Sequence, residues 1–467
     1  MPRFLSAKPD QRLIPLPWGT PLAEWPTEHL VALPRGISRH VVRFIRVGHE
    51  VYAAKEVIEH LAIHEYRLLH DLTRLDAPCV EPVAVVTGRT AADGTALDPV
   101  LITKHLQFSL PYRSLFHSGV RHDTVMRLID ALVVLLAKLH LLGFMWGDVS
   151  LSNVLFLRDA GAFSAYLVDA ETGELHDELT AGQREHDMVI LRTNIFGEFC
   201  DLEAGGLLDE SLDPLTLVDA IDTRYRELWA ELTGVEEFSG GELDRIESRV
   251  RRLNALGFDV AELEVTTTST GDRVLIQPKV VDAGHHSRRL MRLTGLDTEE
   301  NQARRLLNDL DTYRAWTNQG HVNEAVVAHQ WLNANFEPVV AQIPPDLRGK
   351  RELAQFFHEV LDHRWFRSQQ ENRDVPLAEA ARSYVDSVLR NLPDEAMSTE
   401  SMVQVSQGNT AGQLRNPYDP SHGFIDPDEA DDEDEIDPWE AAAEQVDLRT
   451  AGMLDIAALR ARQADQD

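Results

Sequence analysis

The sequence predicts an α+β fold with a small antiparallel-sheet region, a helical region, a second mostly helical domain and a disordered acidic tail. Three observations support this prediction. Three β-rich segments separated by turn residues lie between positions 30 and 56, apolar residues recur at helical spacing in two long segments, and acidic residues dominate a stretch near the C-terminus. Because a chain of 467 residues is too long for one hydrophobic core, we expect two or three domains.

The first region has the pattern of a small sheet with one helix. Turn residues at Pro34–Gly36 and Gly48–His49 separate three β-rich segments, which predicts antiparallel strands. The predicted elements are strands at 30–33, 41–47, 51–55, 83–86 and 100–103 and a helix over 57–75. Residues 1–28 show no clear period, and we expect them to wrap the domain as extended chain.

The helical region and the second domain follow. The predicted elements of the helical region are helices over 124–142, 185–202 and 214–232 and a hairpin of strands at 154–157 and 165–168. The second domain is predicted to contain a helix ending near Leu256, a hairpin at 261–266 and 273–277, and helices over 287–392. The aromatic core predicted for these helices consists of Trp316, Trp331, Phe336, Phe356, Phe357, Trp365 and Phe366. We therefore divide the chain into residues 1–108, 109–235, 236–395 and 396–467.

The composition excludes several classes of protein. The net charge is −32, yet nine of the twelve residues from Asp426 to Asp437 are acidic, so much of the charge belongs to a solvated tail. No basic face is evident, which disfavours a nucleic-acid partner. The longest apolar run, at 132–142, is too short for a membrane span, and because the first ten residues contain no sustained apolar stretch we expect no export signal there. We expect a cytoplasmic protein whose acidic tail has a protein partner.

A few residues have the properties needed for chemistry on phosphates. Asp148 follows the long helix and Asn153 comes five positions later, so a carboxylate can lie beside a hydroxyl group while an amide oxygen reaches a metal ion. Asp169 ends the predicted hairpin, where it can ligate magnesium. Lys55 ends a strand, and a glutamate on the next helix can hold its ammonium against nucleotide phosphates. Glu65 fits the buried helix face better than its alternative, Glu59.

Each of these residues taken singly is common on protein surfaces, but their order along the chain resembles the protein-kinase-like superfamily. The resemblance covers residues 28–235 and is greater to the small-molecule branch and to bacterial lipopolysaccharide-kinase-like proteins than to signalling kinases. It implies a two-lobed fold, with an antiparallel-sheet lobe and a helical lobe, and it implies ATP and Mg²⁺ as cofactors. The implied roles are catalytic base for Asp148, magnesium ligands for Asn153 and Asp169, phosphate-holding pair for Lys55 and Glu65, and nucleotide-binding loop for Gly36 and Ser38.

The chain departs from this family pattern in several places. Trp146-Gly147 replaces the usual His-Arg before the aspartate, and Ser150 stands where many members keep a lysine. Asp169-Ala-Glu171 replaces Asp-Phe-Gly, and the glycine-rich loop is reduced. Asp187 resembles the buried aspartate that braces the loop of the catalytic base, although a helix N-cap is an equal alternative. Only 18 positions separate Asp169 from Asp187, which is short for a peptide-docking segment.

The sequence therefore leaves three functions open. The first is an ATP- and Mg²⁺-dependent phosphotransferase acting on a small-molecule, sugar or lipid-linked hydroxyl group. The second is a pseudokinase-like nucleotide-binding scaffold that recruits a partner through its C-terminal domain and tail, and the third is a protein kinase that modifies itself or a neighbour. The basic cluster at 285–292 is an anion site, a partner of the tail or a solvated helix face. His358 and His363 resemble a zinc motif, but their spacing puts them about 140° apart on a helix, so we reject metal binding there.

Overall fold

The computed structural model describes most of the chain before the acidic tail. The described residues are 2–33, 40–116, 120–209, 211–234, 236–239, 253, 258–267 and 273–392. They form two compact units, the first from the described residues of Met1–Ala230 and Ile343–Val375 with residues 389–392, the second from the described residues of Glu231–Gln342 and Pro376–Val388. The segment Ile343–Val375 thus belongs to the first unit, whereas the sequence-based division placed it in a domain over 236–395.

A six-stranded antiparallel sheet forms the beginning of the first unit, with the strand order β1-β5-β6-β4-β3-β2. Its strands are β1 (Arg3–Leu5), β2 (Leu30–Val31), β3 (Val41–Val47), β4 (Glu50–Glu56), β5 (Pro82–Thr87) and β6 (Val100–Lys104). The five strands predicted from the sequence are confirmed, and β1 was missed. Residues before 30 do not wrap the sheet as extended chain, because they form short 3-10 turns at Gln11–Leu13, Leu22–Glu24 and Thr27–His29. Their side chains Leu13, Trp18 and Trp25 are buried in the core of the sheet.

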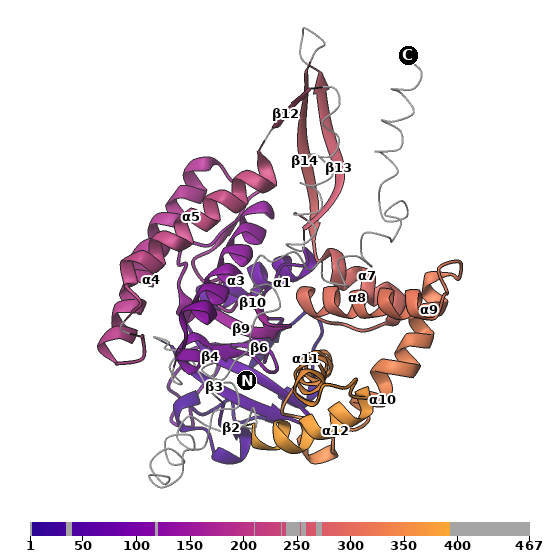
Figure 1. Ribbon diagram of the computed structural model, residues 1–467. Helices are drawn as coiled ribbons and strands as arrows, with labels where there is room; N and C mark the ends of the chain where they lie inside the picture. The colour runs from indigo at the N-terminus through magenta and orange to yellow at the C-terminus, as the bar shows by residue number, and fades with distance from the viewer. Residues whose placement is uncertain are drawn as a thin grey trace. The chain divides into compact units, whose positions relative to one another are not determined.

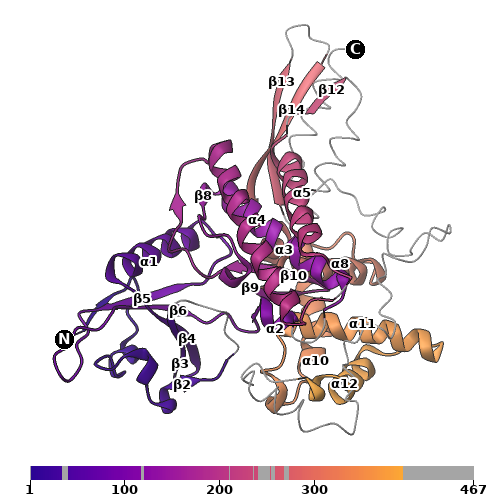
Figure 2. The ribbon, with the colours of Figure 1, turned by 90° about the vertical axis from the view of Figure 1, so that its left-hand side faces the viewer.

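Helix α1 (Glu59–Arg74) packs against β5 and β6 (Figure 2). Its buried residues recur three and four positions apart: Ala62, Glu65, Tyr66, Leu68, Leu69 and Leu72. Glu65 is the one acidic member of this otherwise apolar or aromatic set. The helix therefore carries a carboxylate into the interior of the unit.

The rest of the first unit is mainly helical. Its helices are α2 (Tyr112–Phe116), α3 (His122–Leu141), α4 (Ala181–Ala204), α5 (Pro214–Thr233) and α11 (Leu353–Glu371), with 3-10 turns at Leu151–Asn153, Pro345–Leu347 and Leu389–Asn391. Short strands lie between them: β7 (Leu110–Pro111), β8 (Phe144–Met145), β9 (Val154–Asp159), β10 (Ala162–Leu167) and β11 (Glu174–Leu175). β9 and β10 form the predicted hairpin, which β7 extends, and β11 pairs with β8. Gln355 of α11 accepts a hydrogen bond from the backbone of Ala160, at the tip of this hairpin (3.0 Å).

The second unit contains a sheet and a group of helices. Its strands are β12 (Glu236–Ser239), β13 (Phe258–Thr267) and β14 (Arg273–Ala283), of which β13 and β14 form the long hairpin visible in Figure 1. Its helices are α7 (His285–Thr294), α8 (Glu300–Trp316), α9 (Glu324–Trp331), α10 (Glu337–Val340) and α12 (Leu377–Ser387), with a π-helical turn at Leu332–Phe336. The predicted helix ending near Leu256 lies outside the described residues, apart from Leu253.

The aromatic core predicted for the second domain is confirmed only in part. Trp331, Phe336, Phe356 and Phe357 are buried, but the last two belong to the first unit. Trp316 is 84% exposed, and the prediction is wrong for it as for Trp365 and Phe366. Among the helices that the structure describes, none has the length and the apolar character required to cross a membrane.

Candidate functional site

Lys55, near the end of β4, lies at the centre of a group of carboxylates. Its Nζ donates hydrogen bonds to Glu65 Oε2 at 3.0 Å and to Asp169 Oδ2 at 2.7 Å, and lies 3.2 Å from Glu171 Oε2. The side chain of Lys55 is 12% exposed and that of Glu65 only 1%. Glu59, the alternative partner, is exposed. We refer to Lys55, Glu65, Asp169 and Glu171 as the Lys55 cluster.

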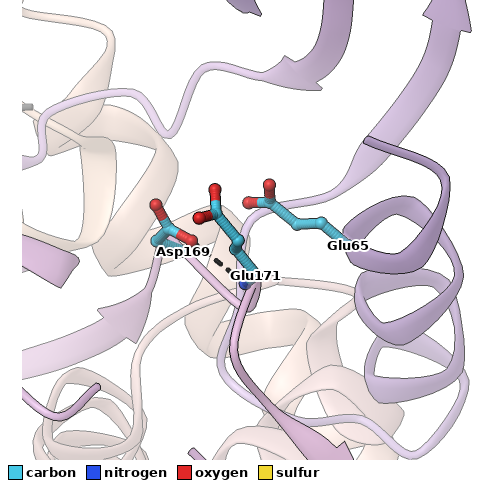
Figure 3. A group of neighbouring side chains, drawn as sticks. All are labelled: Glu65, Asp169 and Glu171. Atoms are coloured by element: carbon cyan, nitrogen blue, oxygen red, sulfur yellow. Dashed lines mark hydrogen bonds between the residues drawn. The ribbon is translucent and has the colours of Figure 1, made fainter. Parts of the chain in front are cut away.

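Three elements supply the three carboxylates and the lysine. β4 holds Lys55, α1 holds Glu65, and the turn after β10 holds Asp169 and Glu171 (Figure 3). The backbone N–H of Glu171 donates a hydrogen bond to Asp169 Oδ1 at 3.0 Å, which fixes the conformation of this turn. One oxygen atom from each carboxylate lies within 4.8 Å of the others. The sequence alone assigns no role to Glu171, which occupies the third position of the Asp169-Ala-Glu171 departure from the family pattern.

The charges of the Lys55 cluster do not balance. Burial opposes the ammonium form of Lys55, but the carboxylates of Glu65 and Asp169 outweigh burial and raise the pKa of Lys55. Burial also raises the pKa of Glu65, to about 8, and the carboxylate of Asp169 acts in the same direction. His40 Nε2 lies 3.0 Å from Glu171 Oε2 and adds a positive charge only when it is protonated. Three carboxylates around one ammonium thus favour retention of a proton or binding of a cation.

The second part of the site is the segment from Gly143 to Asn153, which we call the Asp148 loop. Helix α3 ends at Leu141, and two glycines with positive φ allow the chain to reverse, Gly143 at +81° and Gly147 at +75°. A side chain at Gly143 would also collide with the backbone oxygen of His176, because its Cβ would lie 2.0 Å from that atom. The close approach arises because β8, inside the loop, pairs with β11. The loop is thereby held against the segment that follows Asp169.

Asp148 and Asn153 contact each other directly. Asn153 Nδ2 donates hydrogen bonds to Asp148 Oδ2 at 3.1 Å and to the backbone oxygen of Asp148 at 3.0 Å. Since the amide nitrogen of Asn153 is used in this way, its amide oxygen is the atom suited to a metal ion. The hairpin brings Asn153 beside the end of β10, because its backbone oxygen accepts from Val168 N at 3.1 Å, one residue before Asp169. Asp169 and Asn153 therefore meet at the open end of the β9–β10 hairpin.

Asp187 braces the Asp148 loop from inside α4. Its carboxylate is fully buried and accepts hydrogen bonds from the backbone N–H groups of Trp146 (2.7 Å) and Gly147 (2.8 Å). His140 Nε2 lies 3.1 Å from the same carboxylate, and burial lowers the pKa of His140. The alternative of an N-cap is wrong, because α4 begins at Ala181 and its N-cap is Thr180. Trp146 also donates through Nε1 to the backbone oxygen of Asp169 (3.1 Å), which links the loop to the Lys55 cluster.

Two further residues of α4 contact the Asp148 loop and were not predicted from the sequence. Asn194 Nδ2 donates hydrogen bonds to Asp148 Oδ1 at 3.1 Å and to the backbone oxygen of Val149 at 3.2 Å. Glu198 accepts hydrogen bonds from the backbone N–H groups of Leu151 (2.7 Å) and Ser152 (2.9 Å). Polar side chains at helical spacing give no sequence signal that separates such contacts from a solvated helix face. Gly36 and Ser38, predicted to contact the nucleotide, lie outside the described residues.

Comparisons with known proteins add little to this geometry. Residues 227–389 match the family described as "Domain of unknown function (DUF4032)". No curated protein sequence has significant similarity to the chain. The solved structure titled "WaaP in complex with acyl carrier protein" is similar with a TM-score of 0.32 and 16% sequence identity, over 54% of this chain and 99% of that chain. A score and an identity this low decide neither the fold nor the function.

Proposed function

We propose that the first unit is a kinase-like, ATP- and Mg²⁺-dependent phosphotransferase that acts on a hydroxyl group. The observation that carries this proposal is the convergence of Lys55, Glu65 and Asp169, which are up to 114 positions apart in the sequence, in one set of ion pairs. Asp148 and Asn153 are linked to this set through the β9–β10 hairpin and Trp146. Such an arrangement provides a cation for phosphate groups, oxygen ligands for a metal and a carboxylate for an acceptor hydroxyl.

Each residue has a role that follows from its contacts. Lys55, fixed by buried Glu65, would bind nucleotide phosphates. Asp169 and the amide oxygen of Asn153 would hold Mg²⁺, whose hard oxygen ligands these are. The negative charge of the Lys55 cluster fits a divalent cation, which when bound would neutralise charge on the phosphates. Asp148 would orient the acceptor hydroxyl and accept its proton.

The segment between Asp169 and Asp187 bears on the class of acceptor. It is short, and β11 within it pairs with β8 of the Asp148 loop. A segment held in this way has little free backbone for pairing with an extended peptide. We therefore propose a small-molecule, sugar or lipid-linked hydroxyl as the acceptor, in preference to a protein side chain.

Nucleotide binding tests the proposal. ATP should bind in the presence of Mg²⁺, and Lys55→Ala and Asp169→Ala should each weaken binding by roughly tenfold to a hundredfold, because each removes a charge-assisted contact. Exposed residues of the same type provide matched controls: Lys104→Ala in β6 and Asp177→Ala before α4 should bind ATP as the unaltered protein does. Calorimetric titration measures all five proteins. Equal affinity in both site variants and both controls would remove the basis of the proposal.

A pseudokinase-like scaffold is the second candidate. It is favoured by Ser150, whose side chain is small and buried. The family resemblance implies a lysine at this position. In that case the C-terminal unit and the acidic tail would recruit a partner. Nucleotide binding would then stabilise a conformation of the protein without phosphoryl transfer. Turnover separates the candidates, because a scaffold binds ATP with Mg²⁺ but forms no ADP across a panel of hydroxyl compounds. The same ADP assay, followed by intact-mass measurement of the protein, tests self-modification.

A further inference from the structure

Helix α4 presents three polar side chains to the Asp148 loop, in the order in which the loop passes along the helix. Asp187 binds the backbone of residues 146–147, Asn194 binds residues 148–149, and Glu198 binds residues 151–152. The separations of seven and four positions place the three on one side of the helix. Asp187 and Glu198 contact main-chain N–H groups in these bonds. Asn194 alone of the three reaches the side chain of Asp148.

The carboxylate of Asp148 is held at both oxygen atoms. Oδ1 accepts a hydrogen bond from Asn194 Nδ2 and Oδ2 accepts one from Asn153 Nδ2, each at 3.1 Å. Both amides also bind a backbone oxygen of the loop, that of Val149 for Asn194 and that of Asp148 itself for Asn153. Each amide therefore ties the side chain of Asp148 to the main chain beside it. Two donors on two elements oppose rotation of the carboxylate about its χ angles.

Asn153 has a second proposed role, as a metal ligand, that Asn194 does not have. If the amide oxygen of Asn153 holds Mg²⁺, its orientation follows the metal as well as Asp148. Asn194 comes from a long helix capped by a capping box at Thr180 and Gln183, and its amide contacts the Asp148 loop alone among the contacts described above. It is thus the donor to Asp148 whose position is set by the scaffold rather than by a ligand.

We propose that Asn194 is the positioning residue for Asp148 in phosphoryl transfer; this inference rests on the function proposed above. A neutral amide orients the carboxylate without forming an ion pair with it, so the negative charge stays available for the acceptor's proton. This contact comes from α4 rather than from the segment after Asp169, so the orientation of Asp148 needs no phosphorylation of that segment.

Two substitutions at position 194 separate positioning from packing. Asn194→Ala removes the donor, and Asn194→Asp keeps the shape but places a second carboxylate next to Asp148. The first should lower kcat for ADP formation by roughly tenfold to a hundredfold while the KM for Mg·ATP stays within about twofold, since general-base catalysis depends on orientation. The second should also move the acidic limb of the pH–rate profile to higher pH by about one unit or more, because neighbouring carboxylates share a proton. Water serves as the acceptor in this assay.

Thr193→Ala provides the matched control on α4. Its side chain is exposed and its hydroxyl donates only to the backbone oxygen of Val189 in the same helix among the described contacts, at 3.0 Å. This variant should retain kcat, KM and the pH profile. Thermal unfolding of all variants shows whether the fold is intact, and if Asn194→Ala does not fold, the pH profile of Asn194→Asp decides.

The outcomes distinguish this inference from the proposed function. Reduced kcat with unchanged KM, together with the shifted profile, supports the positioning role. Unchanged kcat in Asn194→Ala overturns it and leaves the phosphotransferase intact, and so does a loss of kcat matched by equal losses of ATP affinity and thermal stability. If the unaltered protein forms no ADP with water or with any compound of the hydroxyl panel, or if its ATP affinity is the same after Lys55→Ala and Asp169→Ala, the proposed function fails and the inference fails with it.

Discussion

The Lys55 cluster and the Asp148 loop hold their carboxylates in opposite ways. In the loop, the neutral amides of Asn153 and Asn194 bind Asp148, and backbone N–H groups of the loop bind Asp187 of α4. In the cluster, three carboxylates share the single ammonium of Lys55. The carboxylates bound at the loop therefore have their hydrogen-bond donors within the protein, whereas the Lys55 cluster has excess negative charge. We therefore expect ligand binding to change the protonation and ion pairs of the Lys55 cluster and to leave the hydrogen bonds of the Asp148 loop nearly unchanged.

The largest expected effect comes from the loop. Asp148→Asn keeps the shape of the side chain but removes its basicity, so ADP formation should fall by about 10²- to 10⁴-fold. Since the hydrogen bonds of Asp187 and Glu198 hold the loop independently of the charge of Asp148, the affinity for Mg·ATP should change by less than about threefold. Steady-state kinetics and calorimetry measure the two quantities. A large loss of affinity would mean that Asp148 belongs to the cluster rather than to a preformed loop.

The next effect concerns the excess charge of the cluster. Glu171→Gln removes one of the three carboxylates, and because like charges repel the phosphates, affinity for ATP without Mg²⁺ should rise by roughly tenfold. The dependence of ATP binding on Mg²⁺ should weaken accordingly. Glu174→Gln, at an exposed position in the same segment, is the control and should behave as the unaltered protein does. If the two variants have equal metal-free affinity, Glu171 does not oppose phosphate binding.

A third effect is a dependence of stability on pH. Burial raises the pKa of Glu65 from 4.5 to about 8, so between these pH values the folded state holds a proton that the unfolded state has released. The free energy of unfolding of the metal-free protein should therefore decrease as pH rises through this window, by about 1–3 kcal/mol given 1.4 kcal/mol per pKa unit and the compensating charge of Lys55. Urea unfolding at pH 5.5 and pH 8.5 measures it.

A Glu65→Gln variant provides the comparison for this pH dependence. It cannot ionise at this position, so its stability should change less between the two pH values than that of the unaltered protein. Equal slopes in both proteins would show that Glu65 is not the group that retains a proton.

The sequence predicted the parts of the site that have local signals. Lys55 and Glu65 were found from a strand end and a helix face, and the structure pairs them. Asp148, Asn153 and Asp169 were found from the order of a helix, a loop and a hairpin. Their catalytic and metal-binding roles, like the domain boundaries, stay predictions. The two-lobed arrangement of the first unit also stays a prediction. The structure describes an α+β unit with an antiparallel sheet.

The parts that were missed have no local signal. Asn194 and Glu198 lie on a helix whose start was predicted at residue 185, four positions after its actual start at Ala181. Because polar residues on a predicted helix usually face solvent, only the approach of the Asp148 loop to α4 shows their contacts. Asp187, for which an N-cap was an equal alternative, lies inside α4, whose N-cap is Thr180. Glu171 was missed because the family pattern has glycine there, so no role could be carried over.

The most direct test of the central claim uses Mn²⁺ as a spectroscopic substitute for Mg²⁺. Electron paramagnetic resonance of free Mn²⁺, with protein-free Mn²⁺·ATP solutions as the reference for chelation by ATP itself, measures how much of the ion binds to the protein with and without ATP. We predict that ATP increases Mn²⁺ binding to the unaltered protein at least about tenfold and that Asp169→Ala abolishes this increase, while Asp177→Ala retains it. Binding of Mn²⁺ that is indifferent to ATP, or that survives unchanged in Asp169→Ala, would contradict a nucleotide–metal site at Lys55 and Asp169.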